Sequence, residues 1–187
     1  MDKVKKHFEA EAQEFDAIIR RLIPYYPQML EAILVALPFE PSEAINVIDL
    51  GCGTGTVAHL VKSVYPNARL TCVDLAETML EMAQAKLGAD GEVRYQLANL
   101  ESYEFEATYD AVLSSLALHH LVSDADKISF YTKVYQSLKP NGVFYNADVI
   151  LGPSAFLQGQ YMAQWRKFMR RQVSACLSAG YWKISDG

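Results

Sequence analysis

The chain has 187 residues, a formal net charge of −5, and 51% hydrophobic and 21% charged residues, which is typical of one soluble globular domain. The negative charge argues against a basic nucleic-acid-binding surface, so we expect no direct nucleic-acid partner. Its three cysteines lack metal-ligand spacing, which predicts reduced thiols, no metal and a cytoplasmic location. The charged start predicts no secretory signal, and no apolar run approaches the roughly 20 residues of a membrane span, so no membrane partner is expected.

The first 40 residues predict a helical segment. Apolar side chains recur at helical spacing over residues 2–22, Pro24 interrupts the pattern, and a second helix is expected to begin around Pro27. The loop "PFEPSEA" separates these helices from a region with a different rhythm. We therefore predict an N-terminal helical cap over residues 1–40 and a core over residues 41–187.

From residue 45, short apolar segments alternate with helical patterns. The predicted strands are residues 45–51, 68–74, 92–98, 109–115 and 143–150, and the later helices are expected near 124–138 and 154–171. This alternation predicts an α/β fold with a doubly wound, mostly parallel sheet that helices cover on both faces. Five strands are evident.

The stretch "DLGCGTG", residues 49–55, follows the first predicted strand and precedes a helix. Its glycines permit positive φ angles and remove Cβ atoms, so a ligand can approach the backbone closely. Amides at the start of the next helix favour a negatively charged group, and we expect Thr54 or Thr56 to cap that helix. Ligands of open parallel sheets bind outside the carboxyl ends of the strands, where this bend is predicted to lie.

Three kinds of nucleotide-binding loop compete for this stretch. A phosphate-binding loop ends in Gly-Lys-Ser/Thr, and the absence of a lysine between Gly51 and Lys62 excludes it. A dinucleotide fingerprint needs glycine or alanine in place of Thr56, which disfavours an NAD-linked oxidoreductase. The third has the form Asp/Glu-x-Gly-x-Gly-x-Gly, with a further acidic residue at the end of the second strand, where the chain has Asp74.

The segments "DLGCGTG", "CVDLAETML" and "LANLESY" together resemble the class I S-adenosylmethionine-dependent methyltransferases, over roughly residues 40–150. The resemblance implies a Rossmann-like methyltransferase fold, S-adenosylmethionine as cofactor and S-adenosylhomocysteine as product. Sheets of that family have seven strands in the order 3-2-1-4-5-7-6. Because the final two strands are missing from the pattern, we expect a C-terminally truncated core, or a fifth strand whose edge the last helix or a second copy covers.

The resemblance also implies roles for residues at the strand ends. Asp49 is linked indirectly to the ammonium group of the cofactor or braces the loop, and Cys52 lines the bend. Asp74 accepts hydrogen bonds from the two ribose hydroxyls, with a helix cap as the alternative. The implied cofactor-binding residues are Tyr26, Asp49, Gly51, Cys52, Gly53, Gly55, Asp74, Leu75, Met79, Asn99, Leu100 and Ser115.

Four of these residues are expected around the adenine. Leu75 and Met79 cover its faces or belong to the core. Asn99 and Leu100 match the family position that reads the adenine edge, where the amide oxygen of Asn99 accepts from the exocyclic amine or only forms a turn.

The N-terminal half, "FDAIIRRLIPYYPQML", resembles carboxy-S-adenosylmethionine synthase within the same family. That resemblance gives Tyr26 a cofactor contact and matches Ser115 to a position where the synthase has asparagine. A carboxylated cofactor also needs a nearby cation, for which Arg166 is available on the last predicted helix, unless "RKFMRR" is a solvated helical face.

Methyl transfer to oxygen or nitrogen can require a general base. The tandem His119 and His120, just after the fourth strand, are the candidates for this role, and filling the start of a loop is the alternative.

We therefore expect an S-adenosylmethionine-dependent methyltransferase that acts on a small-molecule acceptor, with a homodimer as one way to cover the sheet edge. A carboxy-S-adenosylmethionine synthase-like enzyme and a non-catalytic cofactor-binding module are the alternatives.

Overall fold

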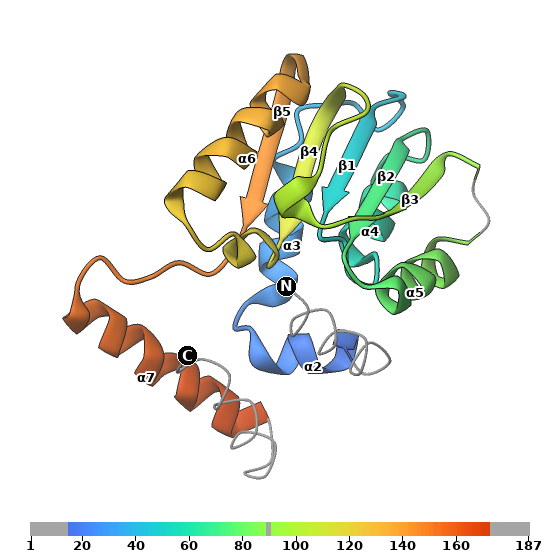
Figure 1. Ribbon diagram of the computed structural model, residues 1–187. Coiled ribbons are helices and arrows are strands. Elements are labelled where there is room, and N and C mark those ends of the chain that lie inside the picture. The colour runs from blue at the N-terminus through green and yellow to red at the C-terminus, as the bar shows by residue number, and fades with distance from the viewer. Residues whose placement is uncertain (1–14, 89–90, 173–187) are drawn as a thin grey trace. The chain divides into compact units, whose positions relative to one another are not determined.

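The computed structural model describes residues 15–88 and 91–172 (Figure 1). Residues 2–14 of the first predicted helix lie outside the described residues, as do residues 173–187 of the predicted core. The described residues form two compact units, one made of residues 29–149 and the other of residues 15–28 and 150–172. None of the described helices is both long enough and apolar enough to cross a lipid bilayer.

The elements follow one another as α2 (Phe15–Leu22), α3 (Tyr26–Val35), β1 (Asn46–Leu50), α4 (Thr56–Val64), β2 (Arg69–Asp74), α5 (Glu77–Leu87), β3 (Val93–Leu97), the short 3-10 helix η2 (Leu100–Ser102), β4 (Tyr109–Ser115), the 3-10 helix η3 (Leu118–His120), α6 (Asp124–Ser137), β5 (Leu138–Ala147) and α7 (Ala155–Gln172). The predicted alternation of strands and helices is therefore present from β1 to α7.

The five strands form one parallel sheet in the order β3-β2-β1-β4-β5 (Figure 1). The chain builds outward from β1 in one direction and then from β4 in the other, so the order reverses between these two strands. This confirms the predicted doubly wound α/β fold. Because all strands run the same way, their carboxyl ends meet at a single edge, and the gap between β1 and β4 is the switch point.

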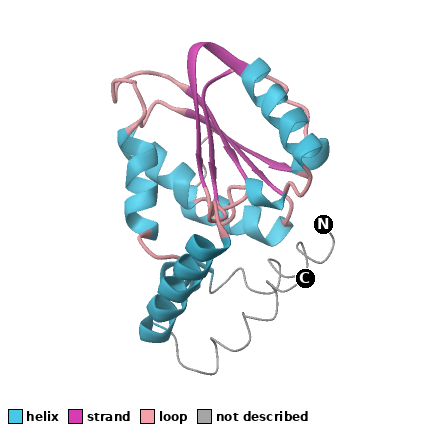
Figure 2. Ribbon diagram, turned by 90° about the vertical axis from the view of Figure 1, so that its left-hand side faces the viewer, coloured by secondary structure: helices cyan, strands magenta, loops and turns pink. Residues whose placement is uncertain are grey.

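Strand β1 shows why helices cover both faces of the sheet (Figure 2). Its side chains alternate between the two faces. Ile48 and Leu50 pack in one buried cluster with Phe130 and Val134 of α6. Asp49 points to the opposite face, toward the backbone of α4. The strand is thus buried on both sides, which explains its nearly continuous apolar sequence.

Strand β5 differs from its prediction at both ends. Leu138 already pairs with Tyr109, and the ladder resumes at Val143 opposite Ala111 after a register shift, so residues 139–142, "KPNG", form an irregular bulge within the strand. Asn141 has a φ of 66°, which provides the local reversal. The strand ends at Ala147 rather than at residue 150, and this leaves Asp148 outside the ladder.

The second unit contains α2 and α7. The indole Nε1 of Trp165 donates to the carbonyl oxygen of Leu22 at 2.6 Å, and Met169 is buried. The cationic side chains of Arg166, Arg170 and Arg171 are exposed on α7.

Candidate active site at the carboxyl edge of the sheet

The bend after β1 has the conformation that its glycines allow. Gly51, Gly53 and Gly55 have φ angles of 68°, 53° and 76°, which other residues rarely adopt. The N–H groups of Gly51 and Cys52 both donate to the carbonyl oxygen of Val73, at 2.8 and 2.9 Å. The bend is therefore fixed against the end of β2 by backbone hydrogen bonds.

Two of these glycines also allow close packing. A Cβ atom at Gly51 would lie 2.2 Å from the Cβ of Ala117, which follows β4, and one at Gly55 would lie 2.8 Å from the Cβ of Ala83 on α5. The bend thus fits tightly between the loop after β4 and helix α5. Bare backbone here serves the packing of the fold as well as the approach of a ligand.

The predicted threonine caps are wrong. Helix α4 has Gly55 as its N-cap, with no side-chain cap hydrogen bond. The hydroxyls of Thr54 and Thr56 instead accept from the Lys86 ammonium, each at 3.0 Å. Because Gly55 adopts a left-handed conformation, the turn itself begins the helix and turns the threonine side chains toward α5.

Asp74, the last residue of β2, is buried beside the bend. One carboxylate oxygen accepts from the N–H of Gly53 at 2.8 Å, and the other accepts from the N–H of Ala76 at 2.9 Å. Burial raises the pKa of Asp74, while these amides partly oppose the shift. The carboxylate thus holds the bend to the start of α5, and its remaining lone pairs can accept from further donors.

Asp49 lies beneath the bend and is almost completely buried. No described donor forms a hydrogen bond to either carboxylate oxygen. The pKa of Asp49 is raised to about 7, chiefly by burial. The nearby Ala58 amide opposes this shift, although it does not form a hydrogen bond, and the charge of Asp74 adds to the shift. An orphaned buried carboxylate is costly, and such groups are concentrated at functional sites.

Other predicted residues line the same region as neutral side chains. Cys52 is buried, and contact with the Cys72 thiol together with burial raises its pKa, so the thiol is uncharged. Ser115 ends β4, and its buried hydroxyl has no hydrogen-bond partner among the described residues. Leu116 follows with a φ of 55°, an uncommon backbone conformation for a non-glycine residue.

The four residues expected around the adenine are placed as follows. Leu75 is half-buried between β2 and α5, and Met79 is 1% exposed within the core. The side chain of Asn99 caps η2, where its oxygen accepts from the N–H of Glu101 at 3.0 Å, so it does form a turn. Leu100 is buried, with a methyl 3.9 Å from where a Cβ of Gly51 would lie.

Tyr26 begins α3 and is buried. It belongs to the second unit, together with Arg166. The sheet unit holds all the other residues that we predicted for the site.

His119 is paired with an aspartate that the sequence analysis missed. Its Nδ1 lies 2.7 Å from Oδ1 of Asp148, and its backbone N–H donates to Oδ2 of the same carboxylate at 3.0 Å. The signal was available, because Asp148 is the first residue after β5 and therefore lies at the carboxyl edge. Asp148 was missed because the predicted strand, residues 143–150, placed it inside the strand rather than after its end.

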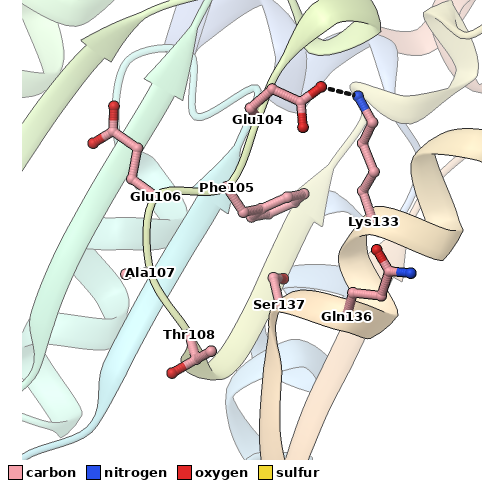
Figure 3. A pocket seen from close by; sticks show the side chains of 8 residues that line it. All are labelled: Glu104, Phe105, Glu106, Ala107, Thr108, Lys133, Gln136 and Ser137. Carbon is pink, nitrogen blue, oxygen red and sulfur yellow. Dashed lines mark hydrogen bonds and ion pairs between the residues drawn. The ribbon is translucent and has the colours of Figure 1, made fainter.

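Two hollows among the described residues lie away from the bend. One, of about 360 Å³, is bordered by the loop 104–108 before β4 and by α6, with the Glu104–Lys133 ion pair across it (Figure 3). The loop enters the amino end of β4, so this hollow lies opposite the edge that carries the bend. No group of three or more potential metal ligands is clustered within the described part of the chain.

A doubly wound sheet with a glycine bend and acidic side chains at its switch point defines a nucleotide-cofactor-binding α/β protein. Comparison with known proteins makes this more specific. Residues 47–142 match the family described as "Methyltransferase domain". The chain belongs to the S-adenosylmethionine-dependent methyltransferase family.

Individual relatives cover different shares of the chain. It is 29% identical over 178 residues to a carboxy-S-adenosyl-L-methionine synthase of Wolinella succinogenes, covering 91% of this chain and 73% of the relative. It is 27% identical over 140 residues to a malonyl-[acyl-carrier protein] O-methyltransferase of Acetivibrio thermocellus, covering 75% of this chain and 47% of the relative. The crystal structure of an S-adenosylmethionine-dependent methyltransferase from Mesorhizobium loti is 31% identical, with a TM-score of 0.53, over 63% of this chain and 52% of that chain. The chain thus spans about half the length of two of these three proteins.

The first prediction concerns the packing of the bend. Gly51→Ala should lower the free energy of unfolding by about 2–4 kcal/mol, because the new methyl group clashes with Ala117 and the positive φ is strained. Gly88→Ala is the matched control, since Gly88 has a φ of 75° and open space around it. Urea unfolding should give the larger loss for Gly51→Ala; equal losses would contradict the close packing.

The second prediction concerns the buried carboxylate. With a pKa of about 7 in the folded chain and an ordinary value when unfolded, Asp49 holds an extra proton in the folded state between about pH 4 and 7. Stability of the ligand-free protein therefore falls as the pH rises through this window. Asp49→Asn removes the titration, so its stability relative to the wild type should rise by about 2–3 kcal/mol between pH 5 and pH 8. Exposed Asp124→Asn should show no such rise, and a constant difference for Asp49→Asn would refute the assignment.

Proposed function

We propose that this chain binds S-adenosylmethionine at the carboxyl edge of the sheet and transfers its methyl group to a small molecule, with S-adenosylhomocysteine as the product. The observation that carries the proposal is Asp49, a buried carboxylate without a partner beneath a bend of bare backbone. A cofactor with a cationic amino group provides the compensation that this carboxylate lacks. A mononucleotide-like ligand also suits the switch point of the sheet.

The residues present fit such a cofactor. Asp74 has two oxygens at the end of β2 and would accept from the ribose hydroxyls while keeping its hydrogen bonds to the bend. Gly51, Gly53 and Gly55 would let the amino-acid end approach the backbone closely, near Asp49.

Other side chains would complete the walls of this site. Leu75 and Leu100 would border the adenine with Asn99 at its edge, and buried Met79 would support this wall from below. Cys52 and Ser115 would line the remaining sides, and Tyr26 would contribute from the cap that we propose for residues 1–40.

The bound cofactor supplies a methyl group that is already activated by the positive sulfur. The chain therefore has to align the acceptor, exclude water and accept a proton where the acceptor carries one. The neutral thiol of Cys52 suits such a site, because an ionised thiol would itself be a competing nucleophile.

Calorimetry with S-adenosylhomocysteine tests the proposal. We expect micromolar binding to the wild type and a loss of about tenfold or more for Asp74→Asn, because an amide replaces one of two charged acceptors. Asp124→Asn, on the exposed start of α6, is the matched control and should bind like the wild type. Lack of binding to the folded wild-type protein would remove the proposal.

A carboxy-S-adenosylmethionine synthase-like activity is the second candidate, favoured by the alignment to the Wolinella succinogenes enzyme over 91% of this chain. Exposed Arg166 of α7 is the cation that we propose for contact with a carboxylated cofactor. Native mass spectrometry distinguishes the two, since a copurified cofactor without the added carboxylate favours simple methyl transfer.

We also propose a cytoplasmic protein without a nucleic-acid partner, for which the free cysteines Cys52 and Cys72 and the net charge of −5 are the support. A homodimer is proposed because β5 pairs with only β4 in the described sheet and Ile128 and Tyr135 of α6 are exposed. Light scattering should give twice the chain mass. A monomer whose β5 amides exchange slowly would contradict the dimer.

A further inference from the structure

The side chains of His119 and Asp148 form a pair at the ends of two neighbouring strands. One carboxylate engages both the ring and the backbone N–H of His119, at 2.7 and 3.0 Å, and also accepts from the N–H of Val149 at 2.8 Å. The Asp148 side chain is 7% exposed, whereas the His119 side chain is 36% exposed. A fixed, buried carboxylate therefore holds a ring that solvent and small molecules can reach.

The contact sets which ring nitrogen carries the proton. Burial alone would raise the pKa of Asp148, but its hydrogen bonds to His119 and to the Val149 amide help to lower it below its ordinary value, so Asp148 is ionised at neutral pH. A carboxylate can only accept, so Nδ1 of a neutral His119 must donate to it. The lone pair of the ring is then on Nε2.

The pair lies beside the proposed cofactor site. Ala117, two residues before His119, packs directly against Gly51 of the bend. Between β4 and His119, the positive φ of Leu116 turns the chain away from the direction of the strand. The N–H of Leu116 donates to the carbonyl oxygen of Ala147, the residue before Asp148. The bend, the end of β4 and the end of β5 are thus joined by contacts at one edge.

His120 supports the same assignment. Its ring centroid is 4.2 Å from that of His119. Burial and the neighbouring His119 lower the pKa of His120 to about 4, so it is uncharged at neutral pH. A cation on His119 thus meets Asp148 on one side and a neutral ring on the other. Of the two histidines, His119 is the one whose ring is in hydrogen-bond contact with the Asp148 carboxylate.

We propose that His119 is the general base of this methyltransferase, that Asp148 is its positioning residue, and that the acceptor is consequently an amine or hydroxyl that still carries a proton at neutral pH. The inference rests on the proposed function and deepens it. A carboxylate acceptor is already ionised at neutral pH and needs no base, so this pair would be superfluous for carboxylate methylation.

The electron and proton balance is simple. A lone pair of the acceptor oxygen or nitrogen, which an ammonium has only after it has given up a proton, forms the new bond to the methyl carbon, and the carbon–sulfur bond breaks with its electrons moving to sulfur. The acceptor's proton goes to Nε2 of His119, and its bonding pair stays on the acceptor. Asp148 then stabilises the resulting imidazolium through the existing contact at Nδ1.

Two substitutions test the pair on the full chain. His119→Gln removes the base, and Asp148→Asn replaces the acceptor of the Nδ1 hydrogen bond by an amide of the same shape. Both should bind S-adenosylhomocysteine within about threefold of the wild type, since they lie outside the proposed cofactor contacts. The binding measurement separates this inference from the proposed function, because a wild-type protein that does not bind S-adenosylhomocysteine would refute the proposed function itself. Exposed His59→Gln and Asp124→Asn are the matched controls.

Activity is measured with labelled S-adenosylmethionine and three probes: phenethylamine, catechol and phenylacetate. We expect label on the amine or the catechol, with kcat lowered about 10²–10⁴-fold in His119→Gln and at least about tenfold in Asp148→Asn, and with KM for the cofactor little changed. Methyl transfer to phenylacetate alone, or to neither the amine nor the catechol, overturns the inference. Undiminished transfer by His119→Gln overturns it as well.

The tautomer provides a readout that is independent of activity. Nitrogen-15 NMR of the wild type should show neutral His119 protonated at Nδ1, and Asp148→Asn should lose this preference. A purely structural pair could lose stability in Asp148→Asn but would show no kcat effect in His119→Gln. Protonation at Nε2 in the wild type refutes the assigned base.

Discussion

The structure depends on the backbone conformation between Gly51 and Gly55. Three glycines with positive φ angles form the tight turn between β1 and α4. Hydrogen bonds to the Val73 carbonyl and the Asp74 carboxylate hold this turn in place. Because Ala117 presses on Gly51, the bend also fixes the loop after β4. One tight turn therefore connects both halves of the sheet at the point where a ligand is expected to bind.

The two carboxylates near the bend have different environments and therefore different roles. Asp74 accepts two backbone hydrogen bonds and is a structural part of the turn even without a ligand. Asp49 has none, and its burial close to Asp74 favours the protonated form in the ligand-free chain. A fold does not need an uncompensated carboxylate for its own stability. Under the proposed function, Asp49 serves cofactor binding, and the ligand-free chain loses stability at neutral pH because of it.

Much of the fold and part of the candidate site could be predicted from the sequence. Apolar runs between helical patterns located the strands, and the alternating glycines located the bend. The end of β5 could not be predicted, because pairing of Leu138 with Tyr109 begins the strand before the "KPNG" bulge and the ladder ends earlier. Asp148 was missed for this reason: its role depends on which residue first leaves the ladder. The threonine caps failed because backbone geometry at Gly55 decides how α4 begins.

The order of the strands separates two chemical tasks. The ends of β1, β2 and β3 carry the glycine bend, Asp74 and Asn99, which suit the recognition of a cofactor. The ends of β4 and β5 carry His119 and Asp148, which suit proton transfer. Because the strand order reverses between β1 and β4, these two sets of groups lie on either side of the switch point, and Gly51 of the bend packs against Ala117 after β4. An acceptor should therefore approach from the β4 and β5 side, where its proton meets the histidine and its nucleophilic atom meets the methyl group.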